Sequence, residues 1–461
     1  MDEKIFFDRV NGFVEKNKEN FLRDMKALVD IRSVRERPEE GAPFGQGPRQ
    51  ALEKALTIAS AMGLSTRNCE GYVGYADLPG KSERQIAIAA HLDVVPAGSG
   101  WFGDPFCMGI KDGFAVGRGT ADDKGPAAVA LYIAKFFREQ GELLPYTLRI
   151  LLGTNEETGM EDMKYYLAHY PQPEFCFVPD GRFPVGYAEK GGYSGVLLSA
   201  PLEGNLLEIY GGEARNIVPD YAYALVKGEI RNLVGRENVA VRREGNYMRI
   251  EARGISGHVA GPSGSVNAIG LLVDYLLDNR LCAPEEEKAL GILRILHSGT
   301  DGSALGIAAS DDVFGPLTCV GSMIRFENGI LRQSVDIRYP GSIDEARLCE
   351  VFAALAKSAG GTFEPGIGRP PFSIDPELPE VRILTDTYNE FTGRGEIPFA
   401  MGGGTYARCF TKAISFGPGE TEQPRPDWGG GAHGANEAVS IEQLLKALRI
   451  YIRAVARLMR I

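Results

Sequence analysis

The stretch that decides the fold is Ile86-Ala87-Ile88-Ala89-Ala90-His91-Leu92-Asp93, a short apolar run that ends in a histidine and an aspartate. Two further runs have the same form, at residues 148–157 (LRILLGTNEE) and residues 175–180 (FCFVPD). Short apolar runs between helical stretches are typical of buried strands in a mostly parallel sheet. We therefore expect an α/β fold in which the polar residues lie at the carboxyl ends of the strands.

Helical patterns flank these strands. Residues 1–35 have apolar side chains at roughly helical spacing, and residues 126–140 form an apolar stripe that Gly141 can cap. Near the end of the chain, residues 440–443 (SIEQ) form a capping box that opens a long final helix. These helices are expected to cover the sheet.

The middle third of the chain has a different pattern. Alternating strands flank turn residues around Asn246 and around Asn328-Gly329, which predicts antiparallel hairpins. Two helices are expected nearby, at about 267–278 and 344–358. This combination predicts an α+β region.

The chain then returns to the α/β pattern at Ile414-Ser415-Phe416, which is typical of a strand. We predict one catalytic domain made from residues 1–188 and 377–461, with a mostly parallel mixed sheet flanked by helices. An inserted α+β lid domain is predicted at 189–376.

Composition restricts the function. The chain has 461 residues, 44% of them apolar, which is too long for one ordinary core. No run of 18 apolar residues is present, and the seven scattered cysteines are typical of reduced thiols. The residues at the start, Met1-Asp2-Glu3-Lys4, lead us to expect no secretory signal. A net charge of −11 disfavours binding to nucleic acid. We expect a cytoplasmic protein that binds neither nucleic acid nor membrane.

Polar residues follow the predicted strands and occupy two glycine-rich loops. The candidates are His91, Asp93, Glu156, Glu157 and Asp180 at strand ends, Asp122 in residues 117–125, and His433 in residues 429–437. Several carboxylates in one cleft would repel one another, and two divalent cations would resolve this. Two such ions, three carboxylates and a bridging hydroxide sum to zero charge. The mixed nitrogen and oxygen donors suit zinc, with manganese or cobalt as alternatives.

Spacing indicates roles for two pairs of residues. His91 and Asp93 are two apart on a strand and can share a face, so Asp93 can orient the imidazole. Glu156 and Glu157 are adjacent, so if Glu157 binds metal, Glu156 is left to act as a general base.

Each of these features has an ordinary structural interpretation when it stands alone. A His-x-Asp pair can be a satisfied structural pair, Glu-Glu a solvated loop, and Asp180 a helix cap. The loop at Gly117-Arg118-Gly119-Thr120 could cradle a phosphate, although it lacks the Lys-Ser/Thr ending of a P-loop. Only the combination favours a metal centre.

The combined motifs resemble the aminoacylase/carnosinase-type co-catalytic metallopeptidases, and most closely bacterial dipeptidases of the peptidase V type. The matching stretches, in the family's order, are residues 90–96, 117–125, 153–158, 179–180, 256–258 and 433–437.

The resemblance implies a role for each matching residue. Asp122 would bridge two metals, with His91 and Asp180 on one metal and Glu157 and His433 on the other. Glu156 would be the general base and Asp93 the residue behind His91. The peptide bond between Asp122 and Asp123 is expected to be cis. In the lid, His258 would stabilise the oxyanion.

The resemblance also implies a substrate-binding set. Asn216, Arg338 and the amides of Gly402, Gly403 and Gly404 would hold the terminal carboxylate of the substrate, with Arg408 as a further candidate. A structural ion pair is the alternative role for Arg338. The enlarged lid implies a monomer.

We therefore predict a zinc-dependent dipeptidase that hydrolyses unblocked dipeptides through a metal-bridging hydroxide. Three alternatives stay open: an N-acyl amino acid deacylase of the same family, a non-catalytic metal-binding or interaction protein on the same scaffold, and a phosphate-binding enzyme that uses the Gly117 loop.

Overall fold

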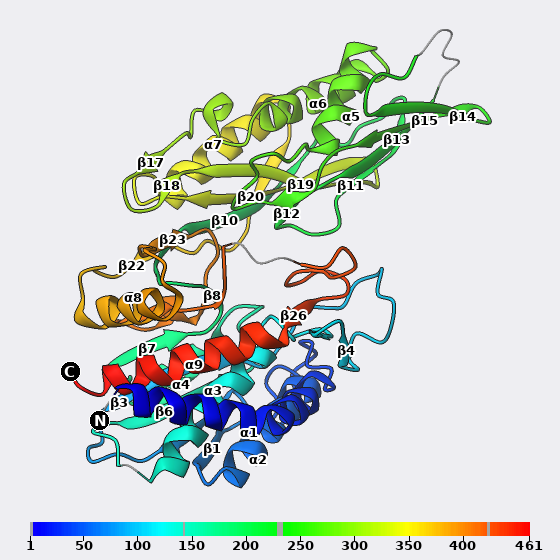
Figure 1. The fold of residues 1–461 in the computed structure, drawn as a ribbon. Coiled ribbons are helices and arrows are strands. Elements are labelled where there is room, and N and C mark those ends of the chain that lie inside the picture. Colours follow the sequence, from blue (N-terminus) through cyan, green and yellow to red (C-terminus); the bar gives the residue numbers. More distant parts are fainter. Residues whose placement is uncertain (1–2, 142, 228–233, 422–424) are drawn as a thin grey trace. The chain divides into compact units, whose positions relative to one another are not determined.

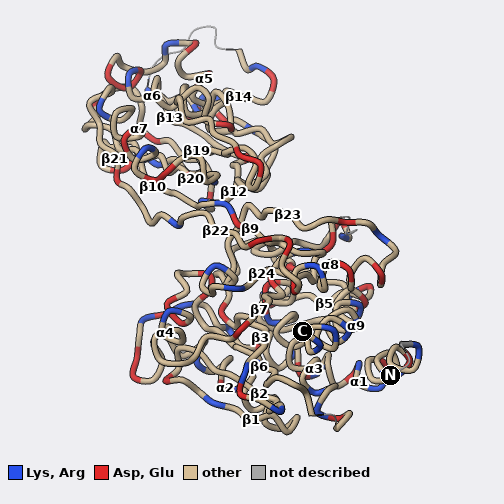
Figure 2. Tube along the Cα trace, turned by 90° about the vertical axis from the view of Figure 1, so that its left-hand side faces the viewer, with Lys and Arg blue, Asp and Glu red and all other residues tan. Residues whose placement is uncertain are grey.

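The computed structural model describes residues 3–141, 143–227, 234–421 and 425–461. The chain forms two compact units (Figure 1 and Figure 2). Unit 1 comprises Met1–Tyr187, Ser373–Phe399 and Thr405–Ile461, and unit 2 comprises Ala188–Phe372 and Ala400–Gly404.

Unit 1 is built on a mixed sheet whose central strands are parallel. The order of its main path is β1 (Ser65–Cys69), β2 (Val73–Leu78), β6 (Thr147–Gly153), β3 (Gln85–His91), β7 (Phe175–Val178), β24 (Ala413–Ser415), β9 (Gly186–Glu189) and β22 (Phe372–Ser373), and β23 (Phe399–Met401) pairs with β9. Strands β6, β3, β7 and β24 run parallel, while β1, β2 and β9 pair antiparallel. The predicted α/β fold with a mixed sheet is confirmed.

Helices cover this sheet because their apolar stripes need a partner surface. The helices are α1 (Glu3–Val29), α2 (Gln46–Ala61), α3 (Lys124–Gln140), α4 (Glu161–His169), α8 (Pro379–Thr392) and α9 (Ile441–Leu458). Helices α1, α3 and α9 pack side by side (Figure 1). Two predicted caps are confirmed: Gly141 ends α3 in the left-handed conformation, and the Ser440 side chain accepts a hydrogen bond from the amide of Gln443.

Short elements complete unit 1. They are β4 (Gly109–Lys111), β5 (Phe114–Val116) and β26 (Ala438–Ser440), which form a three-stranded sheet, the pair β8 (Gly181–Arg182) and β25 (Pro418–Gly419), and the 3-10 helix η2 (Tyr406–Cys409). The sheet of β26, β5 and β4 matters for the site because it joins the chain before Asp122 to the chain after His433.

Unit 2 contains an antiparallel sheet. Its order is β14 (Val239–Glu244), β15 (Tyr247–Arg253), β13 (Tyr221–Lys227), β11 (Leu206–Gly211), β19 (Thr318–Glu327), β20 (Ile330–Tyr339), β10 (Gly191–Leu198) and β21 (Thr362–Pro365). Both predicted hairpins are confirmed. Asn328 and Gly329, which join β19 to β20, both have positive φ, as a tight hairpin turn requires.

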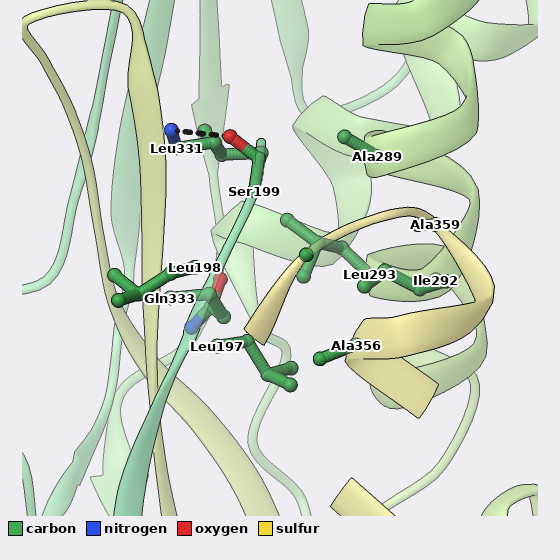
Figure 3. Close-up of a pocket in the computed structure, with 11 residues that line it drawn as sticks. Leu197, Leu198, Ser199, Ala289, Ile292, Leu293, Leu331, Gln333, Ala356 and Ala359 are labelled. Atoms are coloured by element: carbon green, nitrogen blue, oxygen red, sulfur yellow. Dashed lines mark hydrogen bonds between the residues drawn. The ribbon is translucent and has the colours of Figure 1, made fainter. Parts of the chain in front are cut away.

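Helices α5 (Ala268–Asp278), α6 (Pro284–His297) and α7 (Glu345–Ser358) pack on the sheet of unit 2. The helices predicted near 267–278 and 344–358 are confirmed as α5 and α7. Leu197 on β10 and Leu293 on α6 line a gap of about 10 Å³ between the sheet and the helices (Figure 3). That volume holds about one water molecule, so this face is core. The small elements are β12 (Ile217–Val218), β16 (Gly257–His258), β17 (Ser310–Asp311), β18 (Gly315–Pro316) and η1 (Ser303–Leu305).

Candidate metal centre

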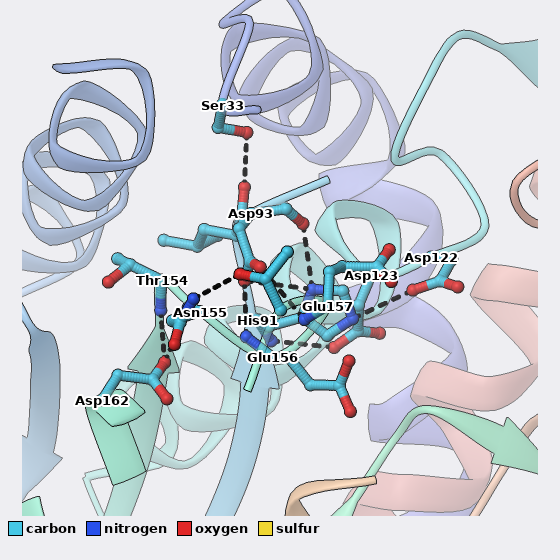
Figure 4. Close-up of polar contacts among 12 residues, drawn as sticks. Ser33, His91, Asp93, Asp122, Asp123, Thr154, Asn155, Glu156, Glu157 and Asp162 are labelled. Atoms are coloured by element: carbon cyan, nitrogen blue, oxygen red, sulfur yellow. Dashed lines mark hydrogen bonds and ion pairs between the residues drawn. The ribbon is translucent and has the colours of Figure 1, made fainter. Parts of the chain in front are cut away.

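Three neighbouring parallel strands of unit 1 deliver their polar residues to one edge of the sheet. His91 is the last residue of β3, Glu156 and Glu157 follow β6, and Asp180 follows β7. The register pairs His91 with Gly153 at the end of β6, so the histidine and the Glu-Glu pair emerge together (Figure 4). Parallel pairing thus converts separate motifs into one cluster.

Asp122 lies between two histidines. Its Oδ1 is 2.9 Å from Nε2 of His91, and its Oδ2 is 3.1 Å from Nε2 of His433. The peptide bond from Asp122 to Asp123 is cis, as the resemblance implies. A carboxylate that turns one oxygen to each imidazole has the form of a bridging ligand.

Each histidine also approaches a second carboxylate. Nε2 of His91 is 3.8 Å from Oδ2 of Asp180, and Nε2 of His433 is 3.1 Å from Oε1 of Glu157. Glu156 can also bring a carboxylate oxygen close to His91 and Asp180, with donor atoms within 4.8 Å of one another. Asp122 therefore separates two sets of nitrogen and oxygen donors.

Two atoms of this cluster are buried and make no hydrogen bond. They are Nε2 of His91 and Oδ1 of Asp122, which lie close together but not in hydrogen-bonding geometry. A buried polar atom without a partner is costly, so it calls for an explanation. Coordination of a cation by both atoms would supply one, and an imidazole nitrogen with carboxylate oxygens is a donor set that zinc accepts.

Several ionisable carboxyl and imidazole groups lie close together in this cluster. Burial raises the pKa of Glu156 well above its ordinary range and raises that of Asp180 to about 7, with Asp122 adding to the second rise. Burial alone would lower the pKa of His433, but its contacts with Asp122 and Glu157 raise it to about 11. The carboxylates thus compete for protons, and divalent cations would neutralise the same negative charge.

Asp93 is buried behind His91 and contacts more than that ring. Its two carboxylate oxygens accept hydrogen bonds from the amides of Glu156 (3.0 Å) and Glu157 (3.1 Å). Nδ1 of His91 is 3.0 Å from the carbonyl oxygen of Asp93 and 3.6 Å from its carboxylate. Asp93 therefore orients the Glu-Glu pair directly, whereas the predicted contact with the imidazole is mainly made by the Asp93 backbone.

The sequence interpretation missed a buried ion pair that ties two loops of the cluster together. Nη1 of Arg118 donates to Glu437 at 2.7 Å, and Oε1 of Glu437 accepts from the amides of Gly119, Ala121 and Asp122. Nη2 of Arg118 also donates to the carbonyl oxygen of His433 at 3.0 Å. The pair thus holds the backbones of Asp122 and His433. Both residues lie within the quoted motifs, but spacing alone does not show that they meet.

A second missed pair supports the loop after β6. Asp162 is fully buried, and its Oδ2 accepts from the amides of Thr154 and Asn155 and from the hydroxyl of Tyr406. Burial raises the pKa of Asp162 to about 6. These contacts position the backbone that leads to Glu156.

The predicted residues of the lid lie in unit 2. The amide of Val259 donates to the carbonyl oxygen of Asn216 at 3.0 Å, and Ile217 pairs with His258. Nδ1 of His258 accepts from the amide of Ala260 at 3.1 Å. When neutral, this imidazole therefore carries its proton on Nε2, where it can be donated.

Arg338 and the glycine loop also meet within unit 2. Nη1 of Arg338 is 3.4 Å from the carbonyl oxygen of Gly402, and a side chain at Gly402 would collide with Ala260. Arg338 also forms a bidentate pair with Asp336, at 2.8 and 3.2 Å. Gly403 and Gly404 continue this loop, whereas Arg408 belongs to unit 1, in η2.

The fold and the cluster together define the class of protein. An α/β unit with histidine and carboxylate donors at the ends of parallel strands, and an α+β unit inserted in its chain, are the features of a metallohydrolase. Residues 87–457 match the description Peptidase family M20/M25/M40, and the chain belongs to this family.

Individual relatives agree with this assignment. The Beta-Ala-Xaa dipeptidase of Lactobacillus delbrueckii subsp. lactis is 30% identical over 467 residues, which cover 96% of this chain and 97% of that protein. Human carnosine dipeptidase 1 shares the fold, with a TM-score of 0.63, 14% identity and 99% of both chains covered. The Bacillus subtilis YXEP protein, described as a dinuclear metal binding peptidase, has a TM-score of 0.52, 11% identity and coverage of 95% and 98%. No helix among the described residues is long and apolar enough to cross a bilayer.

Proposed function

We propose that the protein is a dipeptidase that holds two divalent metal ions and hydrolyses unblocked dipeptides. The observation that carries the proposal is the placement of Asp122, whose two carboxylate oxygens face His91 and His433. Asp180 and Glu157 complete the two donor sets. Family membership and the dipeptidase name of a relative across the full chain support the peptide substrate.

In this proposal His91, Asp180 and Asp122 hold one ion, and His433, Glu157 and Asp122 hold the other. Zinc is the proposed metal because the donors are imidazole and carboxylate groups, with manganese or cobalt as alternatives. The ions would supply a water of lowered pKa and would polarise the scissile carbonyl group.

Glu156 is proposed as the general base. Its carboxyl group is buried beside His91 and Asp180, and burial raises its pKa well above the ordinary range. Glu156 would take a proton from the attacking water and pass it to the nitrogen of the leaving amine. Because Asp93 accepts hydrogen bonds from the amides of both Glu156 and Glu157, it would fix the positions of the base and of its neighbouring ligand relative to each other.

The substrate-binding roles are proposed for residues of unit 2, which we propose acts as the lid. His258 would donate a hydrogen bond from Nε2 to the oxyanion, consistent with an Nδ1 that already accepts one. Asn216, Arg338 and the loop of Gly402, Gly403 and Gly404 would bind the terminal carboxylate of the dipeptide. An arginine fork and backbone amides suit a carboxylate group. We also propose a cytoplasmic monomer, which light scattering after gel filtration would test for the oligomeric state.

The proposed role of Glu156 is tested by Glu156→Ala. We expect turnover to be abolished while two metal ions per chain stay bound, as measured by elemental analysis of the dialysed protein. Glu161→Gln is the control, because Glu161 lies nearby on the exposed end of α4 and should leave activity unchanged. Near-normal turnover in Glu156→Ala would sink the assignment, and loss of a metal would make Glu156 a ligand instead.

The substrate class is tested by a paired assay. A dipeptide and its N-acetylated analogue are compared at equal concentration with enzyme that has been reconstituted with each metal. The proposal expects faster cleavage of the unblocked dipeptide. Preference for the acetylated compound would identify an N-acyl amino acid deacylase of the same family.

A further inference from the structure

Two arginines of unit 2 lie on either side of a residue that has no side chain. Gly192 on β10 pairs with Arg338 on β20, and its other edge forms an isolated bridge with Arg369. Both backbone hydrogen bonds of that bridge are present, at 2.8 and 2.9 Å. Directly paired residues direct their side chains to the same face of a sheet, so Arg338 and Arg369 share a face, about 10 Å apart across Gly192.

The guanidinium group of Arg338 is directed over this glycine. Its Nε and Nη2 are engaged by Asp336, which is two residues away on the same face. Nη1 remains outside that pair and lies 3.8 Å from the position that a Cβ of Gly192 would take. Nη1 also donates to the carbonyl oxygen of Gly402 at 3.4 Å, and this edge of Arg338 lies over Gly192, the residue whose other side pairs with Arg369.

Three arginines lie close enough to the Asp336 carboxylate to act on it. Burial raises the pKa of the Asp336 carboxyl, and the charges of Arg338, Arg369 and Arg215 oppose that rise. Three guanidinium groups therefore act on one carboxylate, although the chain as a whole has a net charge of −11. The Glu345 carboxylate, which lies against Gly368 and accepts a hydrogen bond from Tyr339, belongs to the opposite face of the strands.

We propose that Arg369 forms a second carboxylate subsite beside Arg338, and that the enzyme prefers dipeptides with an acidic C-terminal residue. The inference rests on the proposed dipeptidase function, in which Arg338 binds the terminal carboxylate. A C-terminal aspartate or glutamate carries a second carboxylate close to the first. With Arg338 on one side of Gly192 and Arg369 on the other, each carboxylate has its own guanidinium group.

The experiment compares kcat/KM for Ala-Glu with Ala-Gln, and for Ala-Asp with Ala-Asn, using the full-length metal-loaded enzyme. Each pair matches in shape and differs in one charge. We expect the wild-type enzyme to favour the acidic member by about tenfold, the size of one charge-assisted hydrogen bond. Arg369→Gln should reduce that ratio to about twofold or less while leaving the neutral substrates within about threefold of wild type. Arg369→Lys should restore most of the ratio.

Arg332→Gln is the matched control. Arg332 lies on the same strand and the same face as Arg338, six residues away, and is about 20 Å from the subsite. Its acid-to-amide ratio should equal that of wild type. The inference is overturned if the wild-type enzyme shows no acidic preference, or if Arg369→Gln lowers both members of a pair equally or changes neither. Failure to cleave the neutral dipeptides at all would instead refute the proposed function.

Discussion

Replacement of Glu437 tests whether its buried ion pair with Arg118 holds the candidate metal centre together. Its carboxylate is fully buried, pairs with Arg118 at 2.7 Å and accepts three backbone hydrogen bonds from Gly119, Ala121 and Asp122. Glu437→Gln removes the negative charge and keeps the shape. Removing one partner of a buried ion pair costs about 3–5 kcal/mol, because the other charge stays buried without compensation. We expect a loss of that size in the free energy of unfolding of unit 1.

Metal binding should weaken in the same variant. Groups that orient metal ligands are typically worth about 10–100-fold in metal affinity. Glu437 holds the amide of Asp122, and Arg118 holds the carbonyl oxygen of His433, so both proposed metals should be affected. Competition with a chelator would measure this loss.

The assay is urea unfolding of the metal-free protein, monitored by tryptophan fluorescence. Both tryptophans, Trp101 and Trp428, belong to unit 1, and Trp101 packs on Arg118, so the signal reports this unit. Measurement at pH 8 keeps Glu437 charged, because burial raises its pKa to about 7.

Two further variants complete the test. Glu442→Gln is the control, since this exposed side chain should contribute less than about 0.5 kcal/mol. Arg118→Met combined with Glu437→Gln should recover part of the stability, because it removes both charges. The reasoning is refuted if the free energy of unfolding of Glu437→Gln lies within about 0.5 kcal/mol of the wild-type value and the variant binds metal equally well.

Three other outcomes are expected. Asp93→Asn should lower kcat by about 10–100-fold, because the amides of Glu156 and Glu157 lose a charged acceptor, and an unchanged kcat would remove Asp93 from the site. His297 is half-buried in unit 2, and burial lowers its pKa to about 4, so the unfolded chain takes up a proton at a higher pH than the folded chain does. Stability should fall by up to about 3 kcal/mol as the pH drops from 6.5 to 4, and unfolding curves of His297→Gln should lack that fall. Chelation should abolish dipeptide hydrolysis and lower the thermal midpoint, with zinc, manganese or cobalt restoring both, whereas full activity after chelation would exclude a metal requirement.

The sequence predicts the elements whose pattern is strong. The run at 86–90 is continuously apolar, and the run at 148–152 is apolar except for Arg149, because both are buried on both faces as β3 and β6; such runs are easily recognised. Strand β1 (Ser65–Cys69) is mostly exposed and polar at the edge of the sheet, so it carries no such pattern. Helix α6 was also missed, although Pro284 at its start and the acidic residues that follow are ordinary signals of a helix N-terminus.

The metal cluster likewise combines residues that the sequence predicts with supporting contacts that it does not. His91, Glu156, Glu157 and Asp180 could be proposed from the sequence because they follow predicted strands, and the carboxyl ends of parallel strands meet at one edge of the sheet. Asp122 and His433 lie in glycine-rich loops, and there the motif itself was the signal. The Arg118 and Glu437 pair spans 319 positions, and the Asp162 and Tyr406 pair spans 244. No local pattern indicates which distant loops pack together, so these supporting contacts required the structure. The chain passes between the units at 187/188 and 372/373, and the short return of Ala400–Gly404 to unit 2 has no signal in composition.

The central claim is that Asp122 bridges two metal ions. Crystals of the zinc-loaded protein, with anomalous diffraction recorded on both sides of the zinc edge, test it most directly. The account predicts two peaks, one beside His91, Asp180 and Oδ1 of Asp122, and the other beside His433, Glu157 and Oδ2 of Asp122. A single peak, or two peaks that do not share Asp122, would contradict it.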